Sequence, residues 1–191
     1  MTKPNIAIFA SGTGSNFQAI AAHRNDLAAE IVLLVCDNPE APVIAKAEKL
    51  GIPAFVFQPK SYANKEEYES EILRELKKKN VSWIFLAGYM RIVGPTLLNP
   101  YRGKIVNIHP SLLPSFPGKD AVGQALEAGV KWTGVTVHYI DEGVDTGPII
   151  AQEPVPVLEE DTKEILQHRI QESEHQLYPR VINQLLLQSE G

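Results

Sequence analysis

The sequence has almost no cysteine. Cys36 is the single one in 191 residues, and it lies in the apolar run IVLLVC at 31–36. One cysteine excludes an intrachain disulfide, and its apolar neighbours indicate a small buried side chain rather than a nucleophile. Because a chain without disulfides suits a reducing compartment, we expect a cytoplasmic protein.

Long hydrophobic runs and an excess of basic charge are also missing. The apolar stretch at 5–10 is too short for a secretory signal or a membrane span. The formal net charge is −5 and the pI is about 5.6, whereas nucleic acid or an anionic membrane requires a dominant basic surface. We therefore expect small-molecule ligands, with no nucleic acid and no membrane as a partner.

The 191 residues, 44% of them hydrophobic, are enough for a sizeable core, and we assign 1–191 to one domain. Short β-branched runs alternate with helical patterns, which predicts an α/β fold with a Rossmann-like, mostly parallel sheet and helices on both faces. The alternating pattern at 132–140 predicts a later antiparallel strand. The predicted strands are 5–10, 31–37, 53–57, 81–88, 104–109, 132–140 and 148–157, and the predicted helices are 16–29, 42–50, 65–80 and 162–188.

Two of these helical segments carry specific expectations. Segment 65–80 has one apolar stripe and many charges, so we interpret it as a surface helix whose charges need no functional role. Segment 162–188 contains Pro179, which removes a backbone donor, so we expect a kink or break just before it.

A glycine-rich loop, SGTGSN at 11–16, connects the first strand to the first helix. Glycines allow close backbone approach, and a helix N-terminus offers free N–H groups, so the loop favours phosphate binding. The third glycine of G-x-G-x-x-G is replaced by Phe17, but Asp37 ends the second strand, which weakens a dinucleotide site without removing it. The alternative is a plain turn with Ser15 or Asn16 as helix cap.

A second candidate site is the run IVNIHPSLLPSFPG at 105–118. Asn107 and His109 have the same parity at the end of a predicted strand, so they point to one side of the ligand edge. Asp145, in the Gly-bounded loop 143–147, could complete the set. Such a trio suits acyl transfer, because Asn stabilises an oxyanion, His moves a proton and Asp orients the imidazole. Capping of backbone groups by the Asn-His pair is the alternative.

Other chemistries have weaker support. His138 could line the same crevice, but a hydrogen-bonded core histidine is the favoured interpretation. A metal held by His109, His138 and Asp145 is conceivable, yet no H-E-x-x-H or C-x-x-C pair supports it, so we expect no metal. No G-x-S-x-G motif occurs, which leaves covalent catalysis without a candidate.

Four motifs together, FASGTGSN, LAGYMRIV, IVNIHPSLLPSFPG and DEGVDTGPII, resemble the phosphoribosylglycinamide formyltransferases in order and spacing along the chain. These enzymes are a branch of the wider formyltransferase family. The resemblance implies transfer of a formyl group from 10-formyltetrahydrofolate, as co-substrate, to the amine of glycinamide ribonucleotide in purine biosynthesis.

The resemblance also assigns residues to roles. The catalytic three would be Asn107, His109 and Asp145. The residues that would hold the ribonucleotide and its phosphate are Gly14, Ser15, Asn16, Gln171, Glu172, Ser173 and Glu174. The residues that would border the folate are Lys65, Met90, Arg91, Ile92, Val93, Asn107, Asp141, Glu142, Gly143, Val144 and Asp145. Some members of the family that this sequence resembles have Arg at the position of Lys65, and an ammonium gives a less directional contact to the folate glutamate than a guanidinium fork.

Three rival functions share parts of this pattern. A methionyl-tRNA formyltransferase would need a further module and a basic face, and a formyltetrahydrofolate deformylase usually has a preceding regulatory domain. A nucleotide-binding module without a reaction would explain the glycine-rich loop, but it gives Asn107, His109 and Asp145 no reason to converge. The sequence leaves the oligomeric state open, a homodimer included.

Overall fold

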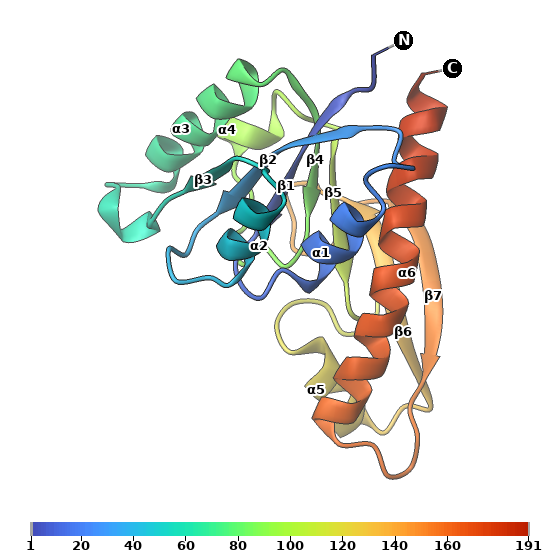
Figure 1. The fold of residues 1–191 in the computed structure, drawn as a ribbon. Helices are drawn as coiled ribbons and strands as arrows, with labels where there is room; N and C mark the ends of the chain where they lie inside the picture. The colour runs from blue at the N-terminus through green and yellow to red at the C-terminus, as the bar shows by residue number, and fades with distance from the viewer. Residues whose placement is uncertain (1, 191) are drawn as a thin grey trace.

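The computed structural model describes residues 2–190, which form a seven-stranded sheet with helices on both faces (Figure 1). The strand order is β3-β2-β1-β4-β5-β6-β7. Strands β1 to β5 run parallel, β6 is antiparallel to β5, and β7 is antiparallel to β6, which confirms the predicted sheet. The strands are β1 (Asn5–Ala10), β2 (Glu30–Cys36), β3 (Ala54–Val56), β4 (Val81–Leu86), β5 (Ile105–His109), β6 (Trp132–Tyr139) and β7 (Ile149–Pro156).

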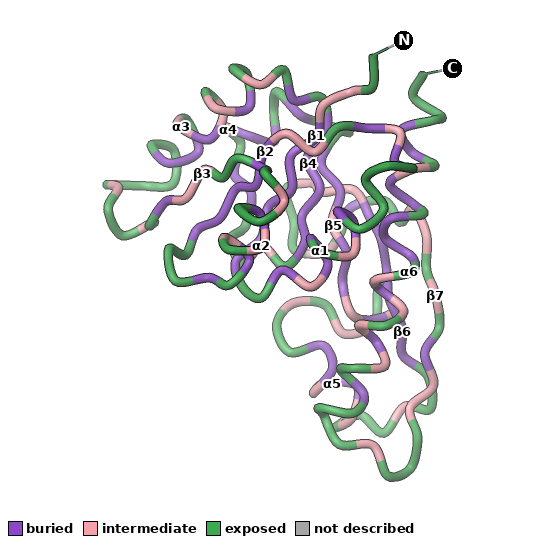
Figure 2. The backbone as a smooth tube through the Cα atoms, in the orientation of Figure 1, coloured by how far each residue is buried: buried purple, intermediate pink, exposed green. Residues whose placement is uncertain are grey.

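The helices pack on the two faces of this sheet, because its central strands are apolar on both sides. The central strands of the sheet are largely buried (Figure 2). Ile6 and Ile8 of β1 contribute to one buried cluster, and Ala7 and Phe9 to the other. Helices α1, α2 and α6 cover the first cluster, and α3 and α4 the second. The helices are α1 (Ser15–Ala22), α2 (Val43–Lys49), α3 (Lys65–Lys78), α4 (Pro95–Leu98), α5 (Ala121–Ala128) and α6 (Lys163–Ser189), with a 3-10 turn at Pro59–Ser61. Among residues 2–190, no helix is both long and apolar enough to cross a bilayer.

The sequence predicts a kink or a break before Pro179, and no break occurs, because helix α6 runs unbroken through this residue (Figure 1). An internal proline costs a helix about 3 kcal/mol, but tertiary packing holds this one in place. Tyr178 is fully buried, and its hydroxyl donates to the carbonyls of Leu86 (2.8 Å), the last residue of β4, and Val106 (3.2 Å), near the start of β5. Val181 and Ile182 continue the buried face beyond the proline. The helix is therefore anchored on both sides of Pro179.

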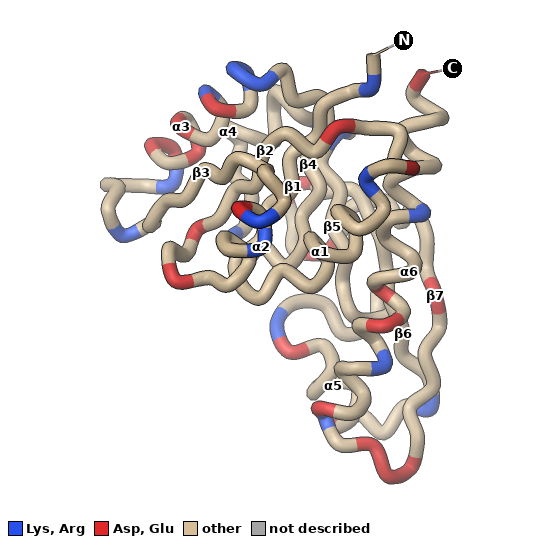
Figure 3. Tube along the Cα trace, viewed as in Figure 1, with Lys and Arg blue, Asp and Glu red and all other residues tan. Residues whose placement is uncertain are grey.

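Helix α3 is the amphipathic surface helix that the sequence predicted, with one exception. Asn64 caps it by accepting from the Glu67 backbone N–H, acidic residues follow, and lysines end it (Figure 3). Tyr68 and Ile72 are buried on its inner face, as expected. Glu69, however, is only 1% exposed. The interpretation of this segment as a surface helix therefore does not extend to Glu69, which is buried.

Candidate active site

Asn107 and His109 lie at the carboxyl end of β5 and, being two residues apart, point to the same side of the strand. The parallel strands β1 and β4 end at the same edge of the sheet, and β6 pairs with β5 beside them. In open α/β sheets, ligands bind at this edge. The strand thus presents an amide and an imidazole at the edge where a ligand is expected.

His109 is held by backbone from the proline-rich loop that follows it. The ring is 6% exposed, and its Nε2 lies 2.9 Å from the Phe116 carbonyl oxygen, an acceptor that fixes a proton on Nε2. Phe116 has φ 54°, a left-handed conformation that a bulky residue adopts only under constraint. Ser111 Oγ, which donates to the Ser115 carbonyl (2.6 Å), supplies part of that constraint. The strained backbone at Phe116 therefore places the carbonyl oxygen that orients the His109 imidazole.

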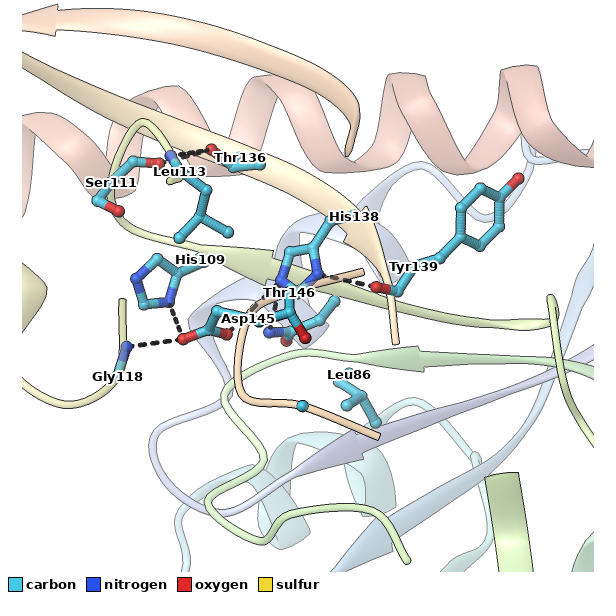
Figure 4. A network of polar contacts seen from close by, with 12 residues as sticks. Leu86, His109, Ser111, Leu113, Gly118, Thr136, His138, Tyr139, Asp145 and Thr146 are labelled. Carbon is cyan, nitrogen blue, oxygen red and sulfur yellow. Dashed lines mark hydrogen bonds and ion pairs between the residues drawn. The ribbon is translucent and has the colours of Figure 1, made fainter. Parts of the chain in front are cut away.

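Asp145 reaches the same place from the loop between β6 and β7. Its Oδ2 accepts from the Gly118 N–H (2.8 Å) and lies 3.5 Å from His109 Nδ1 (Figure 4). Its φ of 54° is a left-handed conformation that Asp tolerates better than most residues. Both imidazole nitrogens of His109 consequently face oxygen acceptors. The structure thus brings together the three residues that the sequence proposed as a set.

His138 is the fourth member of this group. The sequence left open whether it lines the crevice or is a hydrogen-bonded core histidine, and it does both. It is fully buried, and its Nδ1 lies 2.9 Å from the Tyr139 carbonyl oxygen, so the proton sits on Nδ1. Its Nε2 then accepts from Asn107 Nδ2 (3.3 Å) and lies 3.7 Å from Asp145 Oδ1. Burial lowers the pKa of His138, which favours this neutral form. The ring is a core histidine and also orients a site residue.

The glycine-rich loop follows the carboxyl end of β1 and leads into helix α1. Gly14 is the N-cap and has φ 75°, and a Cβ there would collide with the Val43 side chain of α2. Only glycine satisfies both conditions without strain. Ser15 begins the helix, and its N-terminus carries free N–H groups and positive potential. The structure therefore has the loop and helix geometry that a phosphate group would require.

The C-terminal helix meets this loop through one of the four residues at 171–174. Asn16 Nδ2 donates to Glu174 Oε2 (2.9 Å), and the Glu174 side chain is buried. That burial raises the pKa of Glu174 to about 7, although the bond from Asn16 opposes the rise. Glu172 lies on the other side of α6, exposed and 3.5 Å from His168. The structure thus brings Glu174, and not Glu172, to the loop.

The segment 90–93, assigned to folate by resemblance, follows β4 and is tied down at its start. The Met90 N–H donates to Ser11 Oγ (2.8 Å), and Arg91 Nε donates to Asp37 Oδ2 (2.9 Å). Asp37, which could have held a ribose in a dinucleotide site, is therefore paired with Arg91. The side chains of Met90 and Ile92 are 79% and 57% exposed, so the segment offers apolar surface to a ligand. Val93 is buried in the core and has only backbone to offer.

The loop 141–145 has its own internal order. Asp141 Oδ1 accepts from the Gly143 N–H (3.0 Å) and from Thr146 Oγ1 (2.6 Å), and the latter bond lowers the pKa of Asp141. Glu142 pairs with Arg102 (2.6 Å), while Val144 is half exposed. These contacts shape the loop that carries Asp145. Among residues 2–190, no three His, Cys, Asp or Glu side chains are grouped so as to hold a metal ion.

Comparison with known proteins adds the family. Residues 4–182 match the family described as formyl transferase. Phosphoribosylglycinamide formyltransferase of Bacillus subtilis (strain 168) is 57% identical over 182 residues, which cover 94% of this chain and 93% of that protein. The crystal structure of glycinamide ribonucleotide transformylase 1 from Geobacillus kaustophilus superimposes with a TM-score of 0.94 at 60% identity, covering 96% of this chain and 99% of that one. The trifunctional purine biosynthetic protein adenosine-3 of Drosophila melanogaster is 43% identical over 188 residues, which are 96% of this chain but 14% of that longer protein.

Proposed function

This chain belongs to the formyl transferase family, and from that premise we propose that it transfers the formyl group of 10-formyltetrahydrofolate to the amine of glycinamide ribonucleotide. The observation that carries the proposal is the meeting of Asn107, His109 and Asp145 at the ligand edge of the sheet. When an acyl group passes directly to an amine, the reaction needs an amide donor, an imidazole and a carboxylate.

The reaction uses these residues in sequence. The substrate amine attacks the formyl carbon, and a C–N bond forms while the carbonyl oxygen becomes an oxyanion. Asn107, whose amide is oriented by His138, donates its second N–H to that oxyanion. The bond from the formyl carbon to the folate nitrogen then breaks. The proton that the amine loses passes to this nitrogen through His109 Nδ1, which faces Asp145.

The two substrates fit the two sides of this centre. The phosphate of the ribonucleotide binds at Gly14, Ser15 and Asn16, where the N-terminus of α1 supplies donors. The folate lies along 90–93 and 141–145, where Met90, Ile92 and Val144 give it apolar contacts. This assignment places the reacting atoms beside Asn107 and His109.

The test is a formyl-transfer assay with glycinamide ribonucleotide, run beside a control without this acceptor. We expect formate release in the control to be negligible, because the phosphate site implies an acceptor held in place before reaction. The two rates are measured from the tetrahydrofolate and the formate produced. Equal rates with and without the ribonucleotide would favour a deformylase instead.

Gly14→Ala tests the phosphate site. The new Cβ strains a left-handed residue and pushes against Val43, which displaces N–H donors that a charged phosphate uses. Loss of one such hydrogen bond should raise KM for the ribonucleotide about tenfold or more. KM for the folate should change less than twofold, roughly the scatter of such measurements.

Gly51→Ala is the matched control for this variant. Gly51 also has a left-handed φ of 69°, in the turn after α2, and a Cβ there meets nothing within 4 Å. It should lower stability by a similar backbone strain and leave both KM values unchanged. If Gly14→Ala also leaves both constants unchanged, the loop is only a turn.

A further inference from the structure

Two charged side chains of α3 lie beneath the end of the segment 90–94. Lys65 Nζ donates to the Ile92 carbonyl oxygen (2.7 Å), and Glu69 Oε2 accepts from the Gly94 N–H (2.8 Å). Because Lys65 and Glu69 are four residues apart, they project from the same face of the helix. Together they hold one carbonyl and one N–H of the segment, two residues apart. We call these two residues the Lys65–Glu69 clamp.

Burying the carboxyl group of Glu69 costs free energy. Glu69 is 1% exposed, burial raises the pKa of its carboxyl group, and its Oε1 has no hydrogen-bond partner among residues 2–190. For packing alone, an apolar side chain of similar size would be no less stable. The carboxylate therefore has a specific task, and its hydrogen-bonded neighbour is the backbone N–H of Gly94.

Gly94 is shaped to the same contact. A Cβ at this position would lie 2.6 Å from Glu69 Oε1 and 3.0 Å from Lys65 Cδ. Its φ is −90°, so the backbone would accept any residue, and only the clamp requires glycine. Residue 94 and the clamp thus pack as one unit.

The remaining contacts of the segment explain what the clamp adds. Ser11 and Asp37 hold its start, at Met90 and Arg91, from β1 and β2. The clamp holds its end from α3, on the other side of Ile92. The two sets of contacts fix the backbone of the segment at both ends, while the side chains of Met90 and Ile92 stay exposed.

We propose that Glu69 is a positioning residue for the folate, which acts with Lys65 by fixing the backbone of 92–94 against α3. This proposal rests on the function proposed above. It also gives Lys65 a task different from the contact to the folate glutamate that the sequence suggested, since one of its N–H groups is already donated to Ile92. Without the clamp, the segment must be ordered when the folate binds, and that cost appears in folate affinity.

The experiment compares Glu69→Ala, Glu69→Gln, Gly94→Ala and the double variant Glu69→Ala/Gly94→Ala. For Glu69→Ala we expect KM for 10-formyltetrahydrofolate to rise about tenfold, because a hydrogen bond to a charged group is lost. KM for the ribonucleotide should stay within about twofold of the wild type. Glu69→Gln keeps an oxygen that accepts from Gly94, so it should recover most of the lost affinity.

Gly94→Ala should raise the folate KM in the wild-type background but add little in the Glu69→Ala background, because the colliding oxygen is then absent. Such non-additivity is expected only for residues in contact. Glu66→Ala, which removes an exposed glutamate from the first turn of the same helix, is the control and should change neither constant. Equilibrium binding of tetrahydrofolate, which needs no turnover, should follow the same order of variants.

Two outcomes overturn the proposal. One is that the wild-type protein is active and that both Glu69→Ala and Gly94→Ala have the same folate KM as the wild type. Another is an equal rise of both KM values, which would mean that Glu69 only supports the fold. If Glu69→Ala does not fold, the folate KM values of Gly94→Ala and Glu69→Gln test the proposal instead. A wild-type protein that neither binds folate nor transfers formyl would refute the proposed function itself, which distinguishes that failure from the others.

Discussion

Asp145→Asn is expected to lower kcat by roughly 10²–10⁴-fold, the contribution of an oriented general acid-base group. Asparagine adopts the left-handed conformation of Asp145 (φ 54°) readily, and its amide oxygen can still accept from the Gly118 N–H. The loop should therefore keep its shape. What is lost is the negative charge that faces His109 Nδ1 at 3.5 Å. Dissociation constants of both substrates should change little.

A double-mutant cycle on kcat at saturating substrates is the measurement. His109→Asn should lose at least as much rate, and the double variant should be little worse than the worse single one, because residues that act as a unit are not additive. Asp120→Asn is the control, since Asp120 also has φ 54° but lies at the N-cap of α5. Near wild-type turnover of a folded Asp145→Asn would make this carboxylate a loop-structuring residue only.

Asn107→Ala is expected to lower kcat by about 10²–10³-fold, the loss seen when one donor to an oxyanion is removed. The amide is well placed for this task. His138 donates its Nδ1 proton to Tyr139, so its Nε2 accepts one N–H of Asn107 and leaves the other for the substrate. Because burial lowers the pKa of His138, this arrangement persists at neutral pH.

Single-turnover rates with both substrates bound give the chemical step directly. Asn5→Ala removes a comparable half-buried amide, which donates to the Lys79 carbonyl (2.8 Å) at the opposite edge of the sheet, and should leave the rate unchanged. A loss for Asn107→Ala that appears in KM while the single-turnover rate holds would make Asn107 a binding residue.

The sequence was most informative where local pattern and function agree. Alternating β-branched runs predicted the strands, and the equal parity of Asn107 and His109 predicted that both reach the ligand edge. Asp145 followed from its Gly-bounded loop. In each case the relevant geometry is a property of a short stretch of chain, which periodicity and turn chemistry describe.

The parts that could not be predicted depend on distant segments. His138 faces Asn107 because β6 pairs antiparallel with β5 in one register, and no local pattern specifies that register. Glu69 stands in a run of exposed charges, yet it is buried and accepts a hydrogen bond from Gly94, a residue of a distant loop. The unbroken course of α6 past Pro179 depends on the contacts of Tyr178 with two strands. Tertiary contacts decide the outcome in all three.

The two outer strands of the sheet limit how copies of this chain can associate. β3 has three residues, and β7 carries Pro154 and Pro156, which have no N–H to offer an incoming strand. Short length at one margin and prolines at the other both oppose edge-to-edge pairing, the route by which sheets join into larger sheets or fibrils. We therefore expect a homodimer of this protein to form through helices or loops and not by extension of the seven-stranded sheet.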